Sequence, residues 1–348
     1  MKRSHFIFVS TLALVTAIAL TLASFVTPVS ASPNTDVLHS IHSMKVKKTC
    51  TNCASASGNN LSYHGGTGGT GVETGADKVY LIYWGSQWNS NDPSGEAAIQ
   101  QRFFNGVGGS SWNNSVTQYC QGVATGTITC GSAGTHATNP SGVLAGVWYD
   151  NASAAPSKPT QAKLASEATK AAAHFGNTTA ASNTKVQYVI NTATHNSASG
   201  FGTQYCAWHS STSTSYGNIA YTNMPYITDA GSSCGANFVN AGSAGLTDGI
   251  TIVGGHEFAE TETDIYPSTG WIDGSGAENG DKCAWISSGQ GASANISLST
   301  GTFAVQSLWS NAFNGNTGGV CFPTNSHITI SCLEGSPMPA IPLSFMSS

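Results

Sequence analysis

The sequence predicts an α/β to α+β fold, built on a single mixed sheet with flanking helices and disulfide-stapled loops. Three observations carry this prediction. Short runs of β-branched and aromatic residues alternate with helical segments, as in layered structures around one sheet. Nine cysteines follow an export-type leader, which favours disulfides. Forty glycines and many serines and threonines separate the regular segments and indicate long loops.

The leader, residues 1–31, is predicted to be a secretory signal peptide. Lys2 and Arg3 precede an apolar run from Phe6 to Val26. Val29–Ala31 then fits the small-x-small cleavage pattern. The apolar run is also long enough for a membrane anchor, but Pro28 and the cleavage pattern after it favour removal. We therefore expect a secreted protein.

Three further regions are expected after the leader. Residues 32–75 are rich in Ser, Gly and Asn and predict a flexible N-terminal arm or pro-segment. Within them, the glycine-rich run 65–71 lacks the strand and the Lys-Ser/Thr ending of a phosphate loop. Residues 76–325 predict a single globular domain that would carry any catalytic site. Residues 326–348 predict a poorly ordered tail.

The regular elements follow from local patterns of apolar residues, from capping residues and from glycine stops. In chain order we expect strand 79–84, helix 97–107, a short hairpin within 118–129, strand 143–149, helix 161–175, strand 186–191, strand 219–225 and a helix that carries residues 254–264. The segment around Cys206 is expected to be a loop, and 270–322 to be irregular with short strands such as 302–306.

The composition excludes some classes of function. Charged residues make up 8% of the chain, about a third of the usual share. Arg102 is the one arginine after the leader, so no basic patch exists for nucleic acid. No later segment is apolar enough to span a membrane. We expect a monomer with no membrane association after cleavage of the leader.

The cysteines are expected to pair with their neighbours in the sequence. This gives Cys50–Cys53, Cys120–Cys130, Cys206–Cys234 and Cys283–Cys321, with Cys332 left over. A redox role is the alternative for Cys50 and Cys53, but a thioredoxin-like motif would follow a strand and open a helix.

The densest cluster of ionisable residues lies at positions 256–264, where five of nine side chains are ionisable. On a helix, His256 and Glu260 share one face because they are four residues apart. The zincin motif H-E-x-x-H places two zinc ligands at this spacing, with a glutamate general base after the first. Here the pattern is H-E-x-x-E, and carboxylates are acceptable zinc ligands. It predicts a zincin-like active-site helix with Glu257 as the catalytic base.

A third metal ligand must come from elsewhere. Glu262, Asp264, Glu278 and Asp281 are the candidates, and the residues alone leave the choice open. Ca²⁺ is the alternative to Zn²⁺ because acidic side chains are abundant here. A segment of this kind could also be an exposed acidic helix face or a capping cluster without any metal.

Two other interpretations concern residues outside this motif. Ala241–Gly245 resembles a degenerate serine-hydrolase elbow around Ser243, with His327 as the histidine of a triad. Four histidines lie in polar segments and are expected at the surface or in turns: His64, His136, His195 and His209.

Four segments, in this order, resemble the EXORDIUM / phosphate-induced protein family of secreted plant proteins and their exported bacterial relatives. They are Leu61–Gly66, Val79–Gly85, Gly255–Glu260 and Glu278–Cys283. The similarity extends from about residue 60 to residue 322. It implies that the pattern H-E-x-x-E is completed by E-x-x-D-x-C, which favours Glu278 as the third ligand and Asp281 as its support.

The function expected from these features is a secreted, zinc-dependent zincin-like metallohydrolase, a metallopeptidase that acts on an extracellular peptide or protein. Its metal ligands would be His256, Glu260, Glu278 and Asp281. The alternative is a non-enzymatic extracellular or cell-wall-associated protein of EXORDIUM type, structural or signalling, whose metal site is structural or vestigial.

Overall fold

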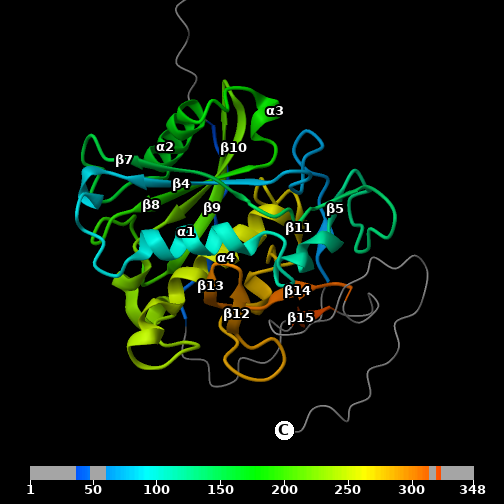
Figure 1. The fold of residues 1–348 in the computed structure, drawn as a ribbon. Coiled ribbons are helices and arrows are strands. Elements are labelled where there is room, and N and C mark those ends of the chain that lie inside the picture. Colours follow the sequence, from blue (N-terminus) through cyan, green and yellow to red (C-terminus); the bar gives the residue numbers. More distant parts are fainter. Residues whose placement is uncertain (1–36, 48–59, 313–318, 323–348) are drawn as a thin grey trace, which may run out of the picture. The chain divides into compact units, whose positions relative to one another are not determined.

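The computed structural model describes residues 37–47, 60–312 and 319–322 (Figure 1). The predicted signal peptide, the tail 326–348 and Cys50, Cys53 and Cys332 lie outside these ranges. The strands are β1 (Val37–Leu38), β2 (His42–Lys45), β3 (Ser62–Tyr63), β4 (Lys78–Trp84), β5 (Cys120–Gln121), β6 (Thr135–His136), β7 (Leu144–Asp150), β8 (Val186–Thr192), β9 (Tyr205–Thr214), β10 (Gly217–Met224), β11 (Trp271–Ile272), β12 (Ala294–Leu298), β13 (Gly301–Val305), β14 (Leu308–Ser310) and β15 (Val320–Phe322). The α-helices are α1 (Glu96–Val107), α2 (Gln161–His174), α3 (Ala180–Asn183) and α4 (Asp248–Thr263). The short 3₁₀ helices are η1 (Ser86–Trp88), η2 (Asn113–Gln118), η3 (Ile227–Cys234), η4 (Gly242–Thr247) and η5 (Asp281–Cys283).

The main sheet is mixed, as the sequence predicts. Its order is β1-β9-β10-β8-β4-β7, and β2 pairs with β9 beside β1. The strands β7, β4, β8 and β10 are parallel, whereas β9 is antiparallel to β10 and to both N-terminal strands. Antiparallel strands at the edge of a parallel sheet are common in α/β and α+β folds.

Helices cover both faces of this sheet (Figure 1). The crossovers β4–α1–β7 and β7–α2–β8 run in opposite directions, so right-handed connections place α1 and α2 on opposite faces. The side chains of β4 alternate accordingly. Val79, Leu81 and Tyr83 enter the larger core with α1 and α4, and Tyr80 and Ile82 enter the core under α2.

Helix α4 carries the H-E-x-x-E pattern and is buried on all sides. It packs against the sheet, against α1 and against β13 (Figure 1). Thr251 Oγ1 donates to the carbonyl of Ala304 in β13 at 2.6 Å. A Cβ at Gly255 would lie 3.2 Å from Trp112 and 3.3 Å from Phe103, so glycine permits this close packing. The alternative of an exposed acidic helix face is therefore wrong.

Three of the expected disulfides are present in the described residues. They are Cys120–Cys130, Cys206–Cys234 and Cys283–Cys321. The expected hairpin within 118–129 is wrong in its pairing, because β5 pairs with β6, which follows Cys130.

Two segments that were expected to lack regular structure are strands of the main sheet. β9 replaces the expected loop around Cys206. The arm 32–75 was expected to be flexible, yet β2 lies along β9 with Met44 fully buried, and β3 pairs with β11. Backbone hydrogen bonding to neighbouring strands explains both cases, because it needs few apolar side chains.

Within the described ranges, no helix is both long enough and apolar enough to cross a membrane.

Candidate metal centre

His256 and Glu260 face each other one turn apart on α4, as the spacing predicts. His256 Nε2 lies 3.0 Å from Glu260 Oε1, and both side chains are fully buried. Two atoms bound to one zinc at about 2.0–2.1 Å and a tetrahedral angle are about 3.3 Å apart. The helix therefore presents two ligand atoms at close to the separation that a zinc ion requires.

Gln306 fixes the orientation of the His256 ring. Its Nε2 donates to the carbonyl of Gly280 at 2.7 Å, which turns its Oε1 toward His256 Nδ1 at 3.1 Å. In this arrangement Nδ1 carries a proton, and this N–H donates a hydrogen bond to Gln306 Oε1. Nε2 has no hydrogen-bond partner among the described residues. An imidazole held in this way offers its Nε2 lone pair to a metal.

Asp281 reaches the same position from η5. Its Oδ1 lies 3.8 Å from His256 Nε2, and its backbone N–H donates to Glu260 Oε1 at 2.8 Å. Atoms of His256, Glu260 and Asp281 form one of the groups that could hold a metal ion. The neighbouring Gly280 permits this approach, since a Cβ there would lie 2.8 Å from His256 Nδ1 and 2.9 Å from Glu260 Oε1.

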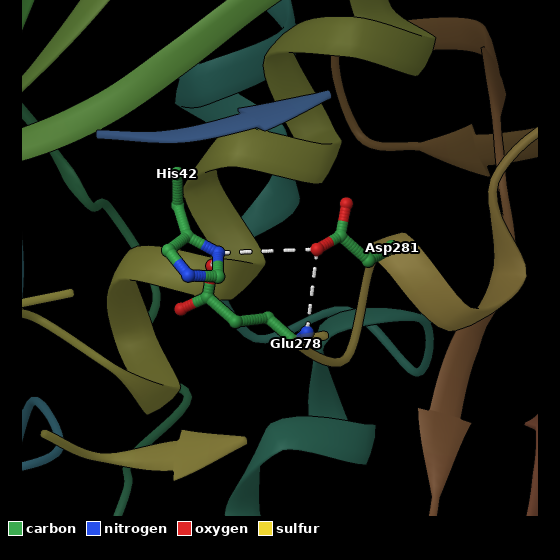
Figure 2. Close-up of side chains that lie close together, drawn as sticks. All are labelled: His42, Glu278 and Asp281. Carbon is green, nitrogen blue, oxygen red and sulfur yellow. Dashed lines mark hydrogen bonds and ion pairs between the residues drawn. The ribbon is translucent and has the colours of Figure 1, made fainter. Parts of the chain in front are cut away.

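Glu278, which the resemblance favoured as third ligand, belongs to a neighbouring group with His42 and Asp281. Figure 2 shows the His42 ring facing both carboxylates. His42 Nδ1 lies 2.7 Å from Glu278 Oε2 and 3.9 Å from Asp281 Oδ2. Asp281 thus turns one oxygen toward His256 and the other toward His42.

His209 on β9 joins these groups, and the expectation that it lies at the surface or in a turn is wrong. It follows Ala207 on the face of the strand that packs toward α4, and it is fully buried. Its Nδ1 lies 3.1 Å from Glu257 Oε2 and 3.6 Å from Glu260 Oε2. Its Nε2 lies 3.5 Å from Glu278 Oε2.

Three imidazoles and three carboxylates therefore alternate in a closed loop of contacts no longer than 3.9 Å. We call this set the histidine–carboxylate ring. Its members, in order of contact, are His256, Glu260, His209, Glu278, His42 and Asp281. Several of its buried atoms have no hydrogen-bond partner among the described residues: His256 Nε2, His209 Nε2, Glu260 Oε2, and Glu278 Oε1 and Oε2. Such atoms are costly in a dry interior unless an ion or water satisfies them.

The charges in the ring shift its pKa values. Burial alone would lower the pKa of His42, but the Glu278 carboxylate outweighs it and raises that pKa to about 9. Burial would also lower the pKa of His256. The Glu260 carboxylate outweighs this effect and raises the pKa of His256 to about 10. Burial raises the pKa of Glu260 to about 8, against the effect of His256. For Glu278, burial is outweighed by His209 and His42, which hold its pKa below the ordinary value. His42, His256 and Glu260 therefore hold protons tightly, and a metal ion would displace these protons.

Solvent reaches the ring on one side. The side chain of Asp281 is 23% exposed and that of His42 is 15% exposed, whereas the other four members are at most 1% exposed. A small ligand would therefore approach between β2 and η5.

Glu257, the expected catalytic base, lies against the ring. Its Oε2 is the acceptor for His209 Nδ1, and its Oε1 accepts the N–H of Met44 at 3.4 Å. It thus orients His209 in the folded protein. The long contact to Met44 leaves Oε1 only weakly held.

Two candidate third ligands have other roles. Glu262 points away from the ring and accepts a hydrogen bond from Asn113 Nδ2 at 2.9 Å. Asp264 accepts hydrogen bonds from the backbone N–H groups of Ser268 and Thr269, so it closes the turn after α4. The serine-hydrolase interpretation gains nothing, because Ser243 lies on exposed η4 and His327 lies outside the described residues.

Sequence reasoning missed His42, His209 and Gln306. His209 carried a signal, because it alternates with Ala207 and Ser211 in a Tyr- and Thr-containing run that suits a strand. His42 and Gln306 carried no such signal in the sequence. His42 reaches the site through the pairing of β2 with β9, and Gln306 reaches it through side-chain contacts with Gly280 and His256.

No protein-family model matches this chain, and neither a curated protein nor a solved structure matches it.

Proposed function

We propose that this protein is an exported, zinc-dependent hydrolase of zincin-like type that acts on peptide bonds. One observation carries the proposal: the buried Nε2 of His256 is turned by Gln306 toward Glu260 and Asp281 and has no hydrogen-bond partner among the described residues. Three ligands that leave one position open are typical of catalytic zinc sites. The mixed imidazole and carboxylate donors favour zinc over calcium. The peptide substrate rests on the similarity of H-E-x-x-E to the zincin motif.

The residues around this position have separable tasks. A bound zinc would supply Lewis acidity toward a carbonyl and lower the pKa of water. His256, Glu260 and Asp281 would hold it, and Gln306 would keep His256 in the binding tautomer. Glu257 would take the proton from water through Oε1, after the long contact to Met44 N–H opens. Its Oε2 would continue to orient His209.

Export is part of this proposal. It is supported by the leader and by the three disulfides, which persist in oxidising environments. The partner in this proposal is an extracellular peptide or protein, and the chain acts as a monomer.

A second candidate is a non-enzymatic extracellular protein of EXORDIUM type with a structural metal site. The burial of the ring favours it, because four of the six members are at most 1% exposed. Structural zinc sites are closed, and they contribute to folding rather than to chemistry.

The two candidates are separated by one comparison with the full chain. Zinc-loaded protein is incubated with a mixture of quenched fluorescent peptides and compared with Glu257→Gln and with chelator-treated protein. The hydrolase proposal expects cleavage that the chelator abolishes and that Glu257→Gln lowers by roughly 100-fold or more, while zinc content stays unchanged. Gln at position 257 can still accept the hydrogen bond from His209, so positioning is retained.

Full activity in Glu257→Gln would contradict the role of this residue as base. An absence of cleavage, together with a melting temperature that falls on chelation, would favour the structural metal site instead.

A further inference from the structure

The histidine–carboxylate ring has more ligand atoms than one metal ion can use. One zinc ion takes four or five ligands, whereas the ring offers three imidazoles and three carboxylates, all within contacts of 3.9 Å or less. The atoms also fall into separate groups rather than around one point. The position used in the proposed function accounts for only one of these groups.

Besides the group of His209, Glu257 and Glu260, a further group contains His42 Nδ1, Glu278 Oε2 and Asp281 Oδ2. His209 Nε2 extends it, because this atom lies 3.5 Å from the same Glu278 oxygen. These separations of 2.7, 3.9 and 3.5 Å bracket the roughly 3.3 Å between ligand atoms of one tetrahedral zinc.

The groups that contain His256 and His42 share Asp281 through different oxygens. Oδ1 lies toward His256, and Oδ2 faces His42, as Figure 2 shows for His42. A carboxylate that turns one oxygen toward each of two ligand sets is suited to bridging two cations. Paired metal ions in hydrolytic sites lie about 3.5–4 Å apart.

The unsatisfied atoms support a second cation independently. His209 Nδ1 is matched to Glu257, which leaves its Nε2 without a hydrogen-bond partner among the described residues. Both oxygens of Glu278 also lack a well-formed hydrogen bond among the described residues, although His42 Nδ1 lies 2.7 Å from Oε2 and the Asp264 carboxyl group lies against Glu278. A buried imidazole nitrogen and a buried carboxylate that face each other without a hydrogen bond fit a cation between them.

We infer that the ring binds two divalent cations bridged by Asp281. The first position has the ligands His256, Glu260 and Asp281 and keeps an open place for a ligand. The second position has the ligands His42, His209, Glu278 and Asp281 and is filled by protein atoms. The inference shares its first position with the proposed function but requires no hydrolysis.

The test is metal stoichiometry on the full chain. Chelator-stripped protein is titrated with Zn²⁺ alone, and bound zinc per chain is measured by calorimetry and by elemental analysis after dialysis. Two ions per chain are expected. His256→Ala should retain only the second position and His42→Ala only the first, so each variant binds one ion. Asp281→Asn should weaken both sites, and His64→Ala, a change at an exposed histidine, should keep two.

X-ray absorption of the wild-type protein loaded with two equivalents gives a readout that needs no variant. It should show a metal–metal separation of about 3.5–4 Å. One ion per wild-type chain overturns the inference and leaves the hydrolase proposal intact. Two ions without peptide cleavage support the inference while the hydrolase proposal fails. Binding of no ion overturns both.

Discussion

Two buried clusters of acidic side chains flank the same helix and differ in the partners of their carboxyl groups. Glu260 points into the histidine–carboxylate ring. Glu262, two residues on and therefore on another side of α4, points toward Glu73 and Asp77. We call Glu73, Asp77 and Glu262 the carboxyl cluster. All three are at most 3% exposed, and they pair with amide and hydroxyl groups of Gln187, Thr138 and Asn113 rather than with imidazoles.

The difference appears in the charge state. In the carboxyl cluster, burial raises the pKa of Asp77 to about 7 and that of Glu262 well above its ordinary value. Each carboxyl group also repels its neighbours, so the cluster retains protons and stays close to neutral. In the ring, imidazoles balance the carboxylates and provide lone pairs for a cation. Buried carboxyl groups alone therefore do not favour cation binding, whereas their alternation with histidines supports the metal site that we propose.

The largest expected effect separates the two clusters directly. Glu260→Gln should abolish metal binding at the position it shares with His256, because an amide is a far weaker zinc ligand than a carboxylate. Glu262→Gln is the matched control and should bind as much zinc as the wild type, since Gln can still accept from Asn113. Elemental analysis after dialysis measures both. Equal zinc loss in the two variants would show that the clusters do not differ in this way.

A smaller effect is expected from the residue that orients His256. Gln306→Leu removes the acceptor for Nδ1–H and should weaken zinc binding by about 10–100-fold. Competition with a chromophoric chelator measures the affinity. Gln306→Glu restores an acceptor for Nδ1–H but loses the donor to the Gly280 carbonyl, so it should recover only part of the binding. If Gln306→Leu binds zinc as tightly as the wild type, the orienting role is refuted.

The carboxyl cluster should show its effect in stability against pH. Asp77 has an ordinary pKa of 3.8 and a folded-state pKa of about 7. Between these values the unfolded chain releases this proton and the folded protein keeps it, so the free energy of unfolding falls as pH rises. The slope for one such group reaches about 1.4 kcal/mol per pH unit.

Asp77→Asn should flatten this part of the profile, because Asn does not titrate. Urea unfolding of metal-free protein between about pH 4 and pH 7 measures the change. An unaltered slope in the variant would mean that Asp77 ionises normally in the folded protein.

The smallest effect is expected at an isolated histidine–carboxylate pair. His195 Nδ1 lies 3.7 Å from Asp229 Oδ2, but the His195 side chain is 87% exposed. His195→Asn should leave zinc content unchanged and alter the free energy of unfolding by less than about 0.5 kcal/mol. Asn is chosen because position 195 has a φ of 61°, which Asn tolerates. Loss of zinc from this variant would show that an exposed histidine–carboxylate pair also contributes to zinc binding. Burial in the ring would then not be what determines binding.

Local runs of apolar, β-branched and aromatic residues were sufficient to predict most of the central sheet. Val79–Trp84 and Val186–Asn191 are apolar, β-branched and aromatic, and both are buried parallel strands as expected. The helix at 161–175 ends within one residue of its expected limit because Gly176 follows it. Near neighbours in the sequence also sufficed for the three described disulfides.

The candidate site was only half predictable. The spacing of His256 and Glu260 is a property of one helix, so the sequence contains it. The positions of His42 and His209 depend on the pairing of β2 with β9, in which His42 lies opposite His209. This register is set by backbone hydrogen bonds between strands far apart in the chain, and Ser- and Thr-rich strands give little apolar pattern to reveal it.

The position of β2 has a consequence for folding. His42 and Asp281 lie near opposite ends of the described chain, and contacts of such long sequence separation form slowly, because a large loop must first close. The Cys283–Cys321 disulfide, two residues after Asp281, restrains the later end of that loop. The contacts of the ring can form only after β2 has paired with β9 and η5 has packed beside α4. Under the two-cation proposal, only a chain that has completed its tertiary structure would bind both ions, and metal content would measure correct folding.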